Sequence, residues 1–266
     1  MRRFLTSVIA LVLILAPAGT ASADPPEGPV YLALGESLVF GEGTPVPEHL
    51  GYVAVLDRRL KAVDCRDGRP AACPLLELVN LGRPGGVTVP DLIGNQLPPA
   101  LQLITDRKGD DDPGNDVVLI TVSIGGNDLF AAVVGNCLSG PTDACAEAIA
   151  TVFAHYSVGL AQILVSLRAA AGPETQIVVM TYDNPLEACF LASLEPFGDI
   201  VLEGGGPLAF GFNDIIRAVA AATDADVADI YGQLEFDDWV GGQDCKHPDI
   251  SGHQQIARIF EGAITS

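Results

Sequence analysis

The chain has 266 residues, of which 48% are hydrophobic and 18% charged, and 34 acidic against 14 basic side chains give it a formal net charge of −20. Such an excess of negative charge repels nucleic acid and anionic lipid headgroups, which excludes both as general binding partners. Length and apolar content suit a single α/β domain.

The first 23 residues have the pattern of a secretory signal peptide. Arg2 and Arg3 are basic, residues 4–17 are almost entirely apolar, and residues 21–23 form a small-residue cleavage site. We expect cleavage near Ala23, secretion, and a mature domain of residues 24–266. The alternative is an uncleaved N-terminal anchor, although the apolar stretch is short for a membrane span. We expect no membrane-spanning segment later in the chain.

The rest of the chain alternates predicted strands and helices. In chain order we predict a strand over 30–34, a helix over 49–63, a strand over 75–79, a helix over 89–104 interrupted at Pro98 and Pro99, a strand over 116–122, a helix over 143–170, a strand over 176–181, a helix over 212–222, a strand over 227–230 and a helix over 250–264. Strands separated by helices indicate crossover connections. The fold class is therefore α/β, a three-layer α/β/α sandwich with a central, mainly parallel five-stranded sheet.

Polar and glycine-rich segments follow several of the predicted strands. Ser37 comes after the first strand, residues 82–86 after the second, and residues 125–128 (Gly-Gly-Asn-Asp) after the third. Asp244 and His247 come after the fifth. Ligands of parallel sheets bind beyond the carboxyl ends of the strands. We therefore expect these segments to converge at one edge of the sheet.

Ser37, His247 and Asp244 are the candidate catalytic residues. A serine hydroxyl becomes a good nucleophile when a base takes its proton, and His247 can supply that base. Asp244 lies three residues before His247 and can orient the imidazole. Taken singly, Ser37 is also a plausible helix N-cap and His247 a plausible surface residue. Their joint position at predicted strand ends favours the catalytic interpretation.

Acyl transfer also requires hydrogen-bond donors for a developing oxyanion. The candidates are the backbone N–H of Ser37, the backbone N–H of Gly85 and the side-chain amide of Asn127. The glycines also suit simple turns, and Asn127 also suits an Asx-turn or a helix cap.

Six cysteines in an exported chain indicate disulfides, although six cysteines allow fifteen pairings. Short loops favour Cys65–Cys73 and Cys137–Cys145, which leaves Cys189 with Cys245. That last bridge would hold the loop with Asp244 and His247. A metal site or a reactive thiol is the alternative, but the sequence has no CxxC motif or Cys/His cluster.

Other residues have weaker claims to a function. Residues 109–116 are rich in carboxylates but lack a complete calcium-loop pattern, so we expect a solvated acidic turn. We expect His253 to be structural. Trp239, with Phe236 and Val240, either lines an acyl pocket or packs the catalytic loop. A metal-dependent hydrolase with Asp244 and His247 as ligands would need further ligands that the sequence does not place.

At the level of motifs, the chain resembles the SGNH (GDSL-type) hydrolase superfamily, in particular exported esterases and lipases of actinobacterial type. Residues 35–43 resemble the first block, with the nucleophile Ser37, and residues 80–85 resemble the second, in which Gly85 supplies an N–H and Gly82 is the fallback. Residues 125–128 resemble the third block, whose Asn127 donates to the oxyanion, and residues 244–248 resemble the last. The resemblance implies a flavodoxin-like fold and three disulfides paired in sequential order.

Glu36 departs from the family pattern, which has aspartate before the nucleophile. Its carboxylate lies one methylene further from the backbone. If this group orders the nucleophile loop by a local hydrogen bond, glutamate does so less well, and we expect an altered rate with function retained.

We therefore predict a secreted, monomeric serine esterase or lipase that needs no cofactor and no metal and acts on a lipid, an acylglycerol or an acetylated sugar. The alternatives are a polysaccharide O-acetylesterase or a phospholipase of the same fold, and a catalytically weak binding paralogue.

Overall fold

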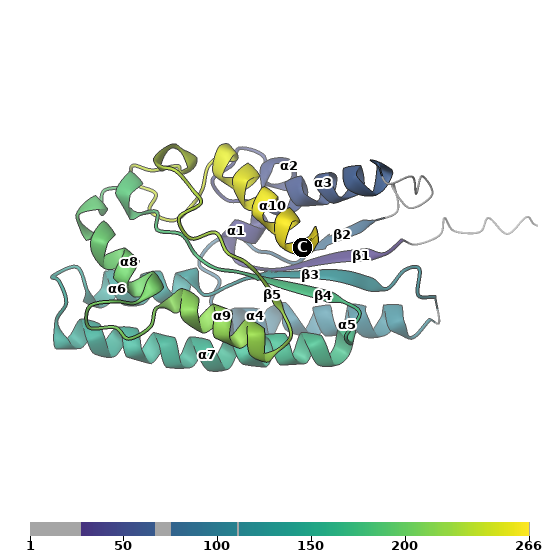
Figure 1. Ribbon diagram of the computed structural model, residues 1–266, viewed down its shortest axis with the longest axis horizontal. Helices are drawn as coiled ribbons and strands as arrows, with labels where there is room; N and C mark the ends of the chain where they lie inside the picture. Colours follow the sequence, from purple (N-terminus) through teal and green to yellow (C-terminus); the bar gives the residue numbers. More distant parts are fainter. Residues whose placement is uncertain (1–27, 67–75, 111, 266) are drawn as a thin grey trace, which may run out of the picture.

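The computed structural model describes residues 28–66, 76–110 and 112–265 (Figure 1). The expected signal peptide and Cys73 lie outside the described residues, so cleavage near Ala23 and the Cys65–Cys73 bridge stay predictions.

A five-stranded sheet forms the centre of the molecule, and every strand pair in it is parallel. Its strands are β1 (Val30–Gly35), β2 (Glu77–Asn80), β3 (Val117–Ser123), β4 (Gln176–Met180) and β5 (Asp226–Ala228), in the spatial order β2-β1-β3-β4-β5. The chain therefore winds outward in both directions from the β1–β3 pair. That pair is the switch point at which such sheets bind ligands. The predicted fold class is confirmed.

Helices cover both faces of the sheet (Figure 1). One face carries α1 (Ser37–Phe40), α2 (Pro47–Leu50), α3 (Tyr52–Arg66) and α10 (Ile250–Thr265). The other carries α4 (Val89–Asn95), α5 (Leu97–Lys108), α7 (Asp143–Ala171) and α9 (Phe212–Ala222). Side chains of β1 alternate between the two cores: Tyr31 and Ala33 pack toward α3 and α10, whereas Leu32 and Leu34 pack toward α7. Both faces are buried, which explains why the strands are continuous apolar runs.

Several elements differ from the sequence prediction. The helix predicted over 89–104 is interrupted, as expected, but at Gln96 and not at the prolines themselves. Pro98 and Pro99 lie in the first turn of α5, where a missing N–H is tolerated. The predicted helix 49–63 likewise divides at Gly51 into α2 and α3. Two helices, α6 (Gly126–Asn136) and α8 (Glu195–Glu203), were not predicted, and neither was the short α1. Short 3₁₀ turns η1 (Leu186–Ala188), η2 (Ala192–Leu194) and η3 (Phe236–Asp238) lie near the carboxyl edge.

Helix α7 is 29 residues long and, by length and composition alone, apolar enough to cross a membrane. This corrects the expectation that no later segment would meet that test. In the fold one side of α7 packs on the sheet, with Phe153, Leu160, Ile163 and Leu167 buried. Its apolar character is that of a core helix.

Two disulfides lie within the described residues, Cys137–Cys145 and Cys189–Cys245. Both match the predicted pairing. The first closes the loop between α6 and α7. The second joins Cys189, directly after η1, to the loop that carries Asp244 and His247, so this loop is tied covalently to the segment after β4.

Candidate active site

Ser37 is placed at the carboxyl end of β1 by a sharp turn at Gly35. Gly35 has a φ of +151°, and a Cβ on it would lie 2.0 Å from the carbonyl oxygen of Ser123 in β3. Only glycine fits this approach. The buried Gln96 side chain fixes the turn from the other side, because it accepts from the Gly35 N–H (2.9 Å) and donates to the Gly35 carbonyl (2.8 Å). Ser37 then begins α1 with its side chain held at the sheet edge.

Ser37, His247 and Asp244 form one hydrogen-bonded row. The distance from Ser37 Oγ to His247 Nε2 is 3.0 Å, and His247 Nδ1 lies 2.7 Å from Asp244 Oδ2. Ser37 is 2% exposed and His247 8%. The carboxylate sets the tautomer in which Nδ1 carries the proton and Nε2 is free to accept one.

Asp244 is itself held in place by the backbone. Its Oδ1 accepts from the N–H groups of Lys246 and His247, both at 2.9 Å. Partial burial alone would raise the pKa of Asp244, but the hydrogen bonds from His247 and from these backbone groups outweigh it and lower the pKa to about 2. Asp244 is therefore ionised throughout the pH range in which a histidine titrates.

The Glu36 side chain bonds to the loop after β3 and to Tyr182 after β4, and among the described residues it has no bond to its own loop. Its buried carboxylate accepts from the N–H groups of Gly126 and Asn127, from the Asn127 amide and from the Tyr182 hydroxyl. The extra methylene of glutamate lets the carboxylate reach across to these donors. We expected Glu36 to order its own loop. Its carboxylate instead links the segments that follow β1, β3 and β4.

Burial raises the pKa of Glu36 to about 7, although the bonds from Tyr182 and Asn127 oppose this. An unfolded glutamate titrates near 4.3, so between these values the folded state binds more protons than the unfolded state. The contribution of Glu36 to the free energy of unfolding should therefore fall as pH rises from about 4.5 to about 7, with a slope of at most about 1.4 kcal/mol per pH unit.

Urea unfolding of the wild type and of Glu36→Gln at several pH values between 4 and 8 measures this slope. We expect the wild-type curve to fall relative to the variant curve as pH rises. Parallel curves would contradict the raised pKa. Glu48→Gln, at an exposed carboxylate in α2, is the matched control.

Of the three expected oxyanion donors, the Asn127 amide and the Gly85 N–H already have acceptors in the protein, and the Ser37 N–H has none among the described residues. The Asn127 amide nitrogen donates to Glu36 and to the Val87 carbonyl (3.0 Å), while Lys246 Nζ lies 3.4 Å from Asn127 Oδ1. Because both neighbours of the nitrogen are acceptors, this orientation of the amide is the one that fits. The Ser37 N–H has no acceptor within the part of the chain that the structure describes. The role of Asn127 toward an oxyanion stays a prediction.

Gly85, the other expected donor, is occupied by Glu42. The Gly85 N–H donates to Glu42 Oε1 at 2.9 Å, and Glu42 Oε2 lies 3.1 Å from His247 Nε2. The fallback glycine, Gly82, donates to Asn80 Oδ1, two residues before it, at 2.8 Å, so Gly85 is the glycine of this loop that Glu42 links to His247. The two carboxylate oxygens of Glu42 thus bridge the Gly85 N–H and His247 Nε2.

His253 anchors the backbone of Glu42. It is fully buried, its Nδ1 accepts from the Tyr52 N–H (3.1 Å), and its Nε2 donates to the Glu42 carbonyl (2.8 Å). Burial lowers the pKa of His253 to about 4, so the ring is neutral at pH 7. The bonds of His253 fix α10 against the nucleophile loop, in line with the structural role expected for it.

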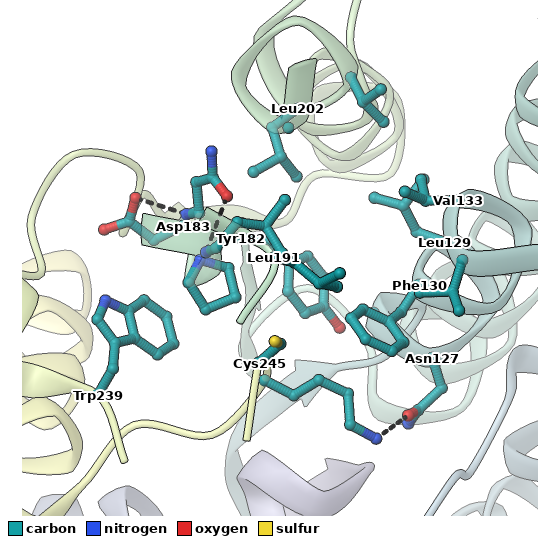
Figure 2. Close-up of a pocket in the computed structure, with 18 of the residues that line it drawn as sticks. Asn127, Leu129, Phe130, Val133, Tyr182, Asp183, Leu191, Leu202, Trp239 and Cys245 are labelled. Carbon is teal, nitrogen blue, oxygen red and sulfur yellow. Dashed lines mark hydrogen bonds between the residues drawn. The ribbon is translucent and has the colours of Figure 1, made fainter. Parts of the chain in front are cut away.

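Other sequence candidates lie elsewhere. Asp110 and Asp112 bond to their own turn, through Asp112 N, Gly114 N and the Asn115 amide. Within the described residues, no group of three or more His, Cys, Asp or Glu side chains could hold a metal ion. Phe236 and Val240 are exposed, whereas Trp239 is buried and faces a cavity beside Ser37 (Figure 2).

The sequence matches the model of the GDSL-like lipase/acylhydrolase family over residues 33–255, a range that contains the whole hydrogen-bonded row. The chain belongs to this family. The resemblance in the motif blocks is thereby confirmed, and as a GDSL-like acylhydrolase the chain is a carboxylic ester hydrolase. No curated protein matches it significantly.

Solved structures share the fold of this GDSL-like acylhydrolase at low sequence identity. A lipase from a goat rumen metagenome has a TM-score of 0.63 and 18% identity, over 88% of this chain and 97% of that one. The acetylxylan esterase Axe2 from Geobacillus stearothermophilus has a TM-score of 0.57 and 17% identity, over 90% and 95% of the two chains. A family 3 carbohydrate esterase from Clostridium thermocellum has a TM-score of 0.52 and 15% identity, over 90% and 96%. At these identities the likeness establishes the fold.

Sequence reasoning missed two side chains of the site, Glu42 and Tyr182. Tyr182 follows β4 directly, so the rule that placed functional residues after β1 and β3 would have found it if applied to β4. Glu42 lies in the first motif block, but its position over Gly85 depends on loop geometry for which the sequence has no signal.

Proposed function

We propose that this GDSL-like acylhydrolase is a serine esterase that works through a Ser37-His247-Asp244 triad and an acyl-enzyme. The observation that carries the proposal is the pair of distances along the row, 3.0 Å from Ser37 Oγ to His247 Nε2 and 2.7 Å from His247 Nδ1 to Asp244 Oδ2. These are the contacts that let a neutral histidine take the serine proton.

In the first half-reaction Ser37 Oγ attacks the ester carbonyl carbon while His247 Nε2 takes the hydroxyl proton. The Ser37 N–H is free to donate to the oxygen that becomes negative, and the Gly85 N–H can do so once it exchanges its bond to Glu42 for one to the substrate. The bond from carbon to the alcohol oxygen then breaks, and His247 returns its proton to that oxygen. The alcohol leaves, and Ser37 carries the acyl group.

In the second half-reaction a water molecule attacks the acyl carbon and gives its proton to His247. The bond from carbon to Ser37 Oγ breaks, the carboxylic acid is released, and the proton returns to the serine. Asp244 stays ionised throughout and stabilises the imidazolium that forms twice per cycle.

Covalent labelling tests the proposal directly. A fluorophosphonate should add to the folded protein in a 1:1 ratio, and peptide mapping should place the label on Ser37. Turnover of p-nitrophenyl butyrate should be lost in parallel with labelling. Ester turnover by fully labelled protein, or a label on another residue, would refute the triad.

We expect Glu42→Ala to raise kcat/KM, by roughly tenfold on the scale of one hydrogen bond to a charged group. The substitution frees the Gly85 N–H for the substrate and removes a negative charge beside the developing oxyanion. Steady-state kinetics of wild type, Glu42→Ala and the surface control Glu48→Ala measure the effect. A fall in kcat would show instead that Glu42 positions the Gly85 loop.

We further propose that the protein is exported after removal of residues 1–23. The basic, apolar and small-residue segments of the N-terminus support this, as do the two disulfides, which form in oxidising compartments. N-terminal sequencing of protein exported from a bacterial host should begin at Asp24. An intact Met1 in a membrane fraction would indicate an anchored protein.

A further inference from the structure

A deep apolar cavity opens beside Ser37. The space in it that the centre of a water-sized sphere can occupy is about 110 Å³. Its walls come from α6, from the segment between β4 and the end of α8, and from the buried Trp239, as Figure 2 shows for Leu129, Phe130, Val133, Leu191 and Leu202. Ser37, Gly126 and Asn127 lie at the catalytic end.

Most polar side chains in the wall already have protein partners, and the charged one, Lys246, lies beside Asn127, with its Nζ 3.4 Å from Asn127 Oδ1 and over the Phe130 ring. The Asp183 carboxylate accepts from the N–H groups of Asn184, Gly232 and Leu234. The Asn184 amide donates to Glu195 O and Asp199 and accepts from Leu186 N. The Tyr182 hydroxyl donates to Glu36. A sugar ring in this cavity would lose its water contacts and find few partners besides the Lys246 ammonium, which disfavours it.

The position of the cavity distinguishes the acyl side of an ester from the alcohol side. His247 must hand its proton to the leaving alcohol, so that alcohol lies next to His247 Nε2. The residues that line the cavity include Ser37 but not His247, Glu42 or Gly85. The part of the substrate that enters the cavity is therefore the part that stays on Ser37.

We propose that this cavity binds the aliphatic acyl chain of the substrate, and that the enzyme acts on fatty-acyl esters in preference to acetyl esters. The inference rests on the proposed serine mechanism and adds the substrate class to it. An acetyl group would leave the apolar walls unfilled, whereas each methylene of a longer chain moves from water into them.

A ladder of p-nitrophenyl esters from acetate to dodecanoate tests the substrate class. Each added methylene is expected to raise kcat/KM by up to about fourfold until the cavity is full, so octanoate should exceed acetate by at least about a hundredfold. Val133→Phe places a ring in the cavity and should lower the octanoate-to-acetate ratio by more than about tenfold. Val165→Phe, on an exposed valine of α7, is the matched control and should leave the ratio unchanged.

A binding measurement keeps the test independent of turnover. Trp239 is the chain's one tryptophan and faces the cavity, so its fluorescence reports occupancy. In Ser37→Ala, sodium decanoate should change the emission in a saturable way that Val133→Phe weakens, and sodium acetate should not.

A preference for acetate, an unchanged ratio in folded Val133→Phe, or no fluorescence response to decanoate would each overturn the acyl-chain assignment. In those cases Ser37-dependent acetate hydrolysis would leave the serine mechanism standing. No Ser37-dependent turnover of any ester would instead mean that the proposed function itself has failed.

Discussion

Ser37→Ala is expected to lower kcat for ester hydrolysis by roughly 10⁶-fold, the scale of losing the nucleophile of a serine hydrolase. The row from Ser37 to Asp244 is continuous, so without the hydroxyl His247 has no proton to take and no acyl-enzyme forms. The neighbouring donors remain, and they supply the residual rate. Such a low kcat can be measured with p-nitrophenyl butyrate in stopped assays that run for hours and are corrected for the uncatalysed rate.

Ser139→Ala is the matched control, because Ser139 lies exposed in the loop closed by Cys137–Cys145 and far along the chain from the triad. Circular dichroism should show both variants folded. If Ser37→Ala kept more than about a hundredth of wild-type activity, the nucleophile would be another group, and the catalytic role of Ser37 would be wrong.

Asp244→Asn is expected to lower kcat by roughly 10⁴-fold. Asp244 accepts at both oxygens, from two backbone N–H groups on one side and from His247 Nδ1 on the other. An amide has only one accepting atom. With the backbone donors on one side, its NH₂ group must face His247, which then holds its proton on Nε2 and cannot act as a base toward Ser37.

Asp237→Asn, at an exposed carboxylate in η3, controls for the loss of one negative charge. The pH dependence of kcat separates an orienting role from a general electrostatic one, because the wrong tautomer disables the base at every pH where the ring is neutral. A loss smaller than about tenfold would show that the backbone alone orients His247.

The sheet and the long helices could be predicted because their signals are local. The run Val117–Ser123 is rich in β-branched residues, and α9 coincides with the predicted helix over residues 212–222. Helix α6 was missed because it begins with Gly126 and Asn127 directly after Gly125, a sequence typical of a turn. The interruption expected at Pro98 and Pro99 lies two residues earlier, at Gln96, whose side chain bonds to Gly35 in β1, a contact that the local sequence does not show.

In the candidate site, too, some residues could be predicted from the sequence and the positions of others could not. Ser37, Asp244 and His247 could be found because parallel strands bring their carboxyl ends together, whatever the loops do in detail. The positions of Glu42 over Gly85 and of Glu36 between Asn127 and Tyr182 could not, because both depend on side-chain rotamers and loop paths. Of the residues that line the cavity, only Trp239 was a sequence candidate for a pocket wall, because α8 and η2, which form part of the wall, are short elements of nine and three residues.

The hydrogen bond between Ser37 and His247 spans 210 residues of sequence, and the one between Glu42 and His253 spans 211. Ser37, the proposed nucleophile, follows the first strand, and His247, the proposed base, lies in the loop before the last helix, so the row forms only after α10 has docked beside α3. A chain that folds from its N-terminus gains enzymatic activity as its final step, because contacts this distant in sequence form late. Hydrolysis of a chromogenic ester therefore times the completion of refolding, and its onset should lag behind the recovery of secondary structure.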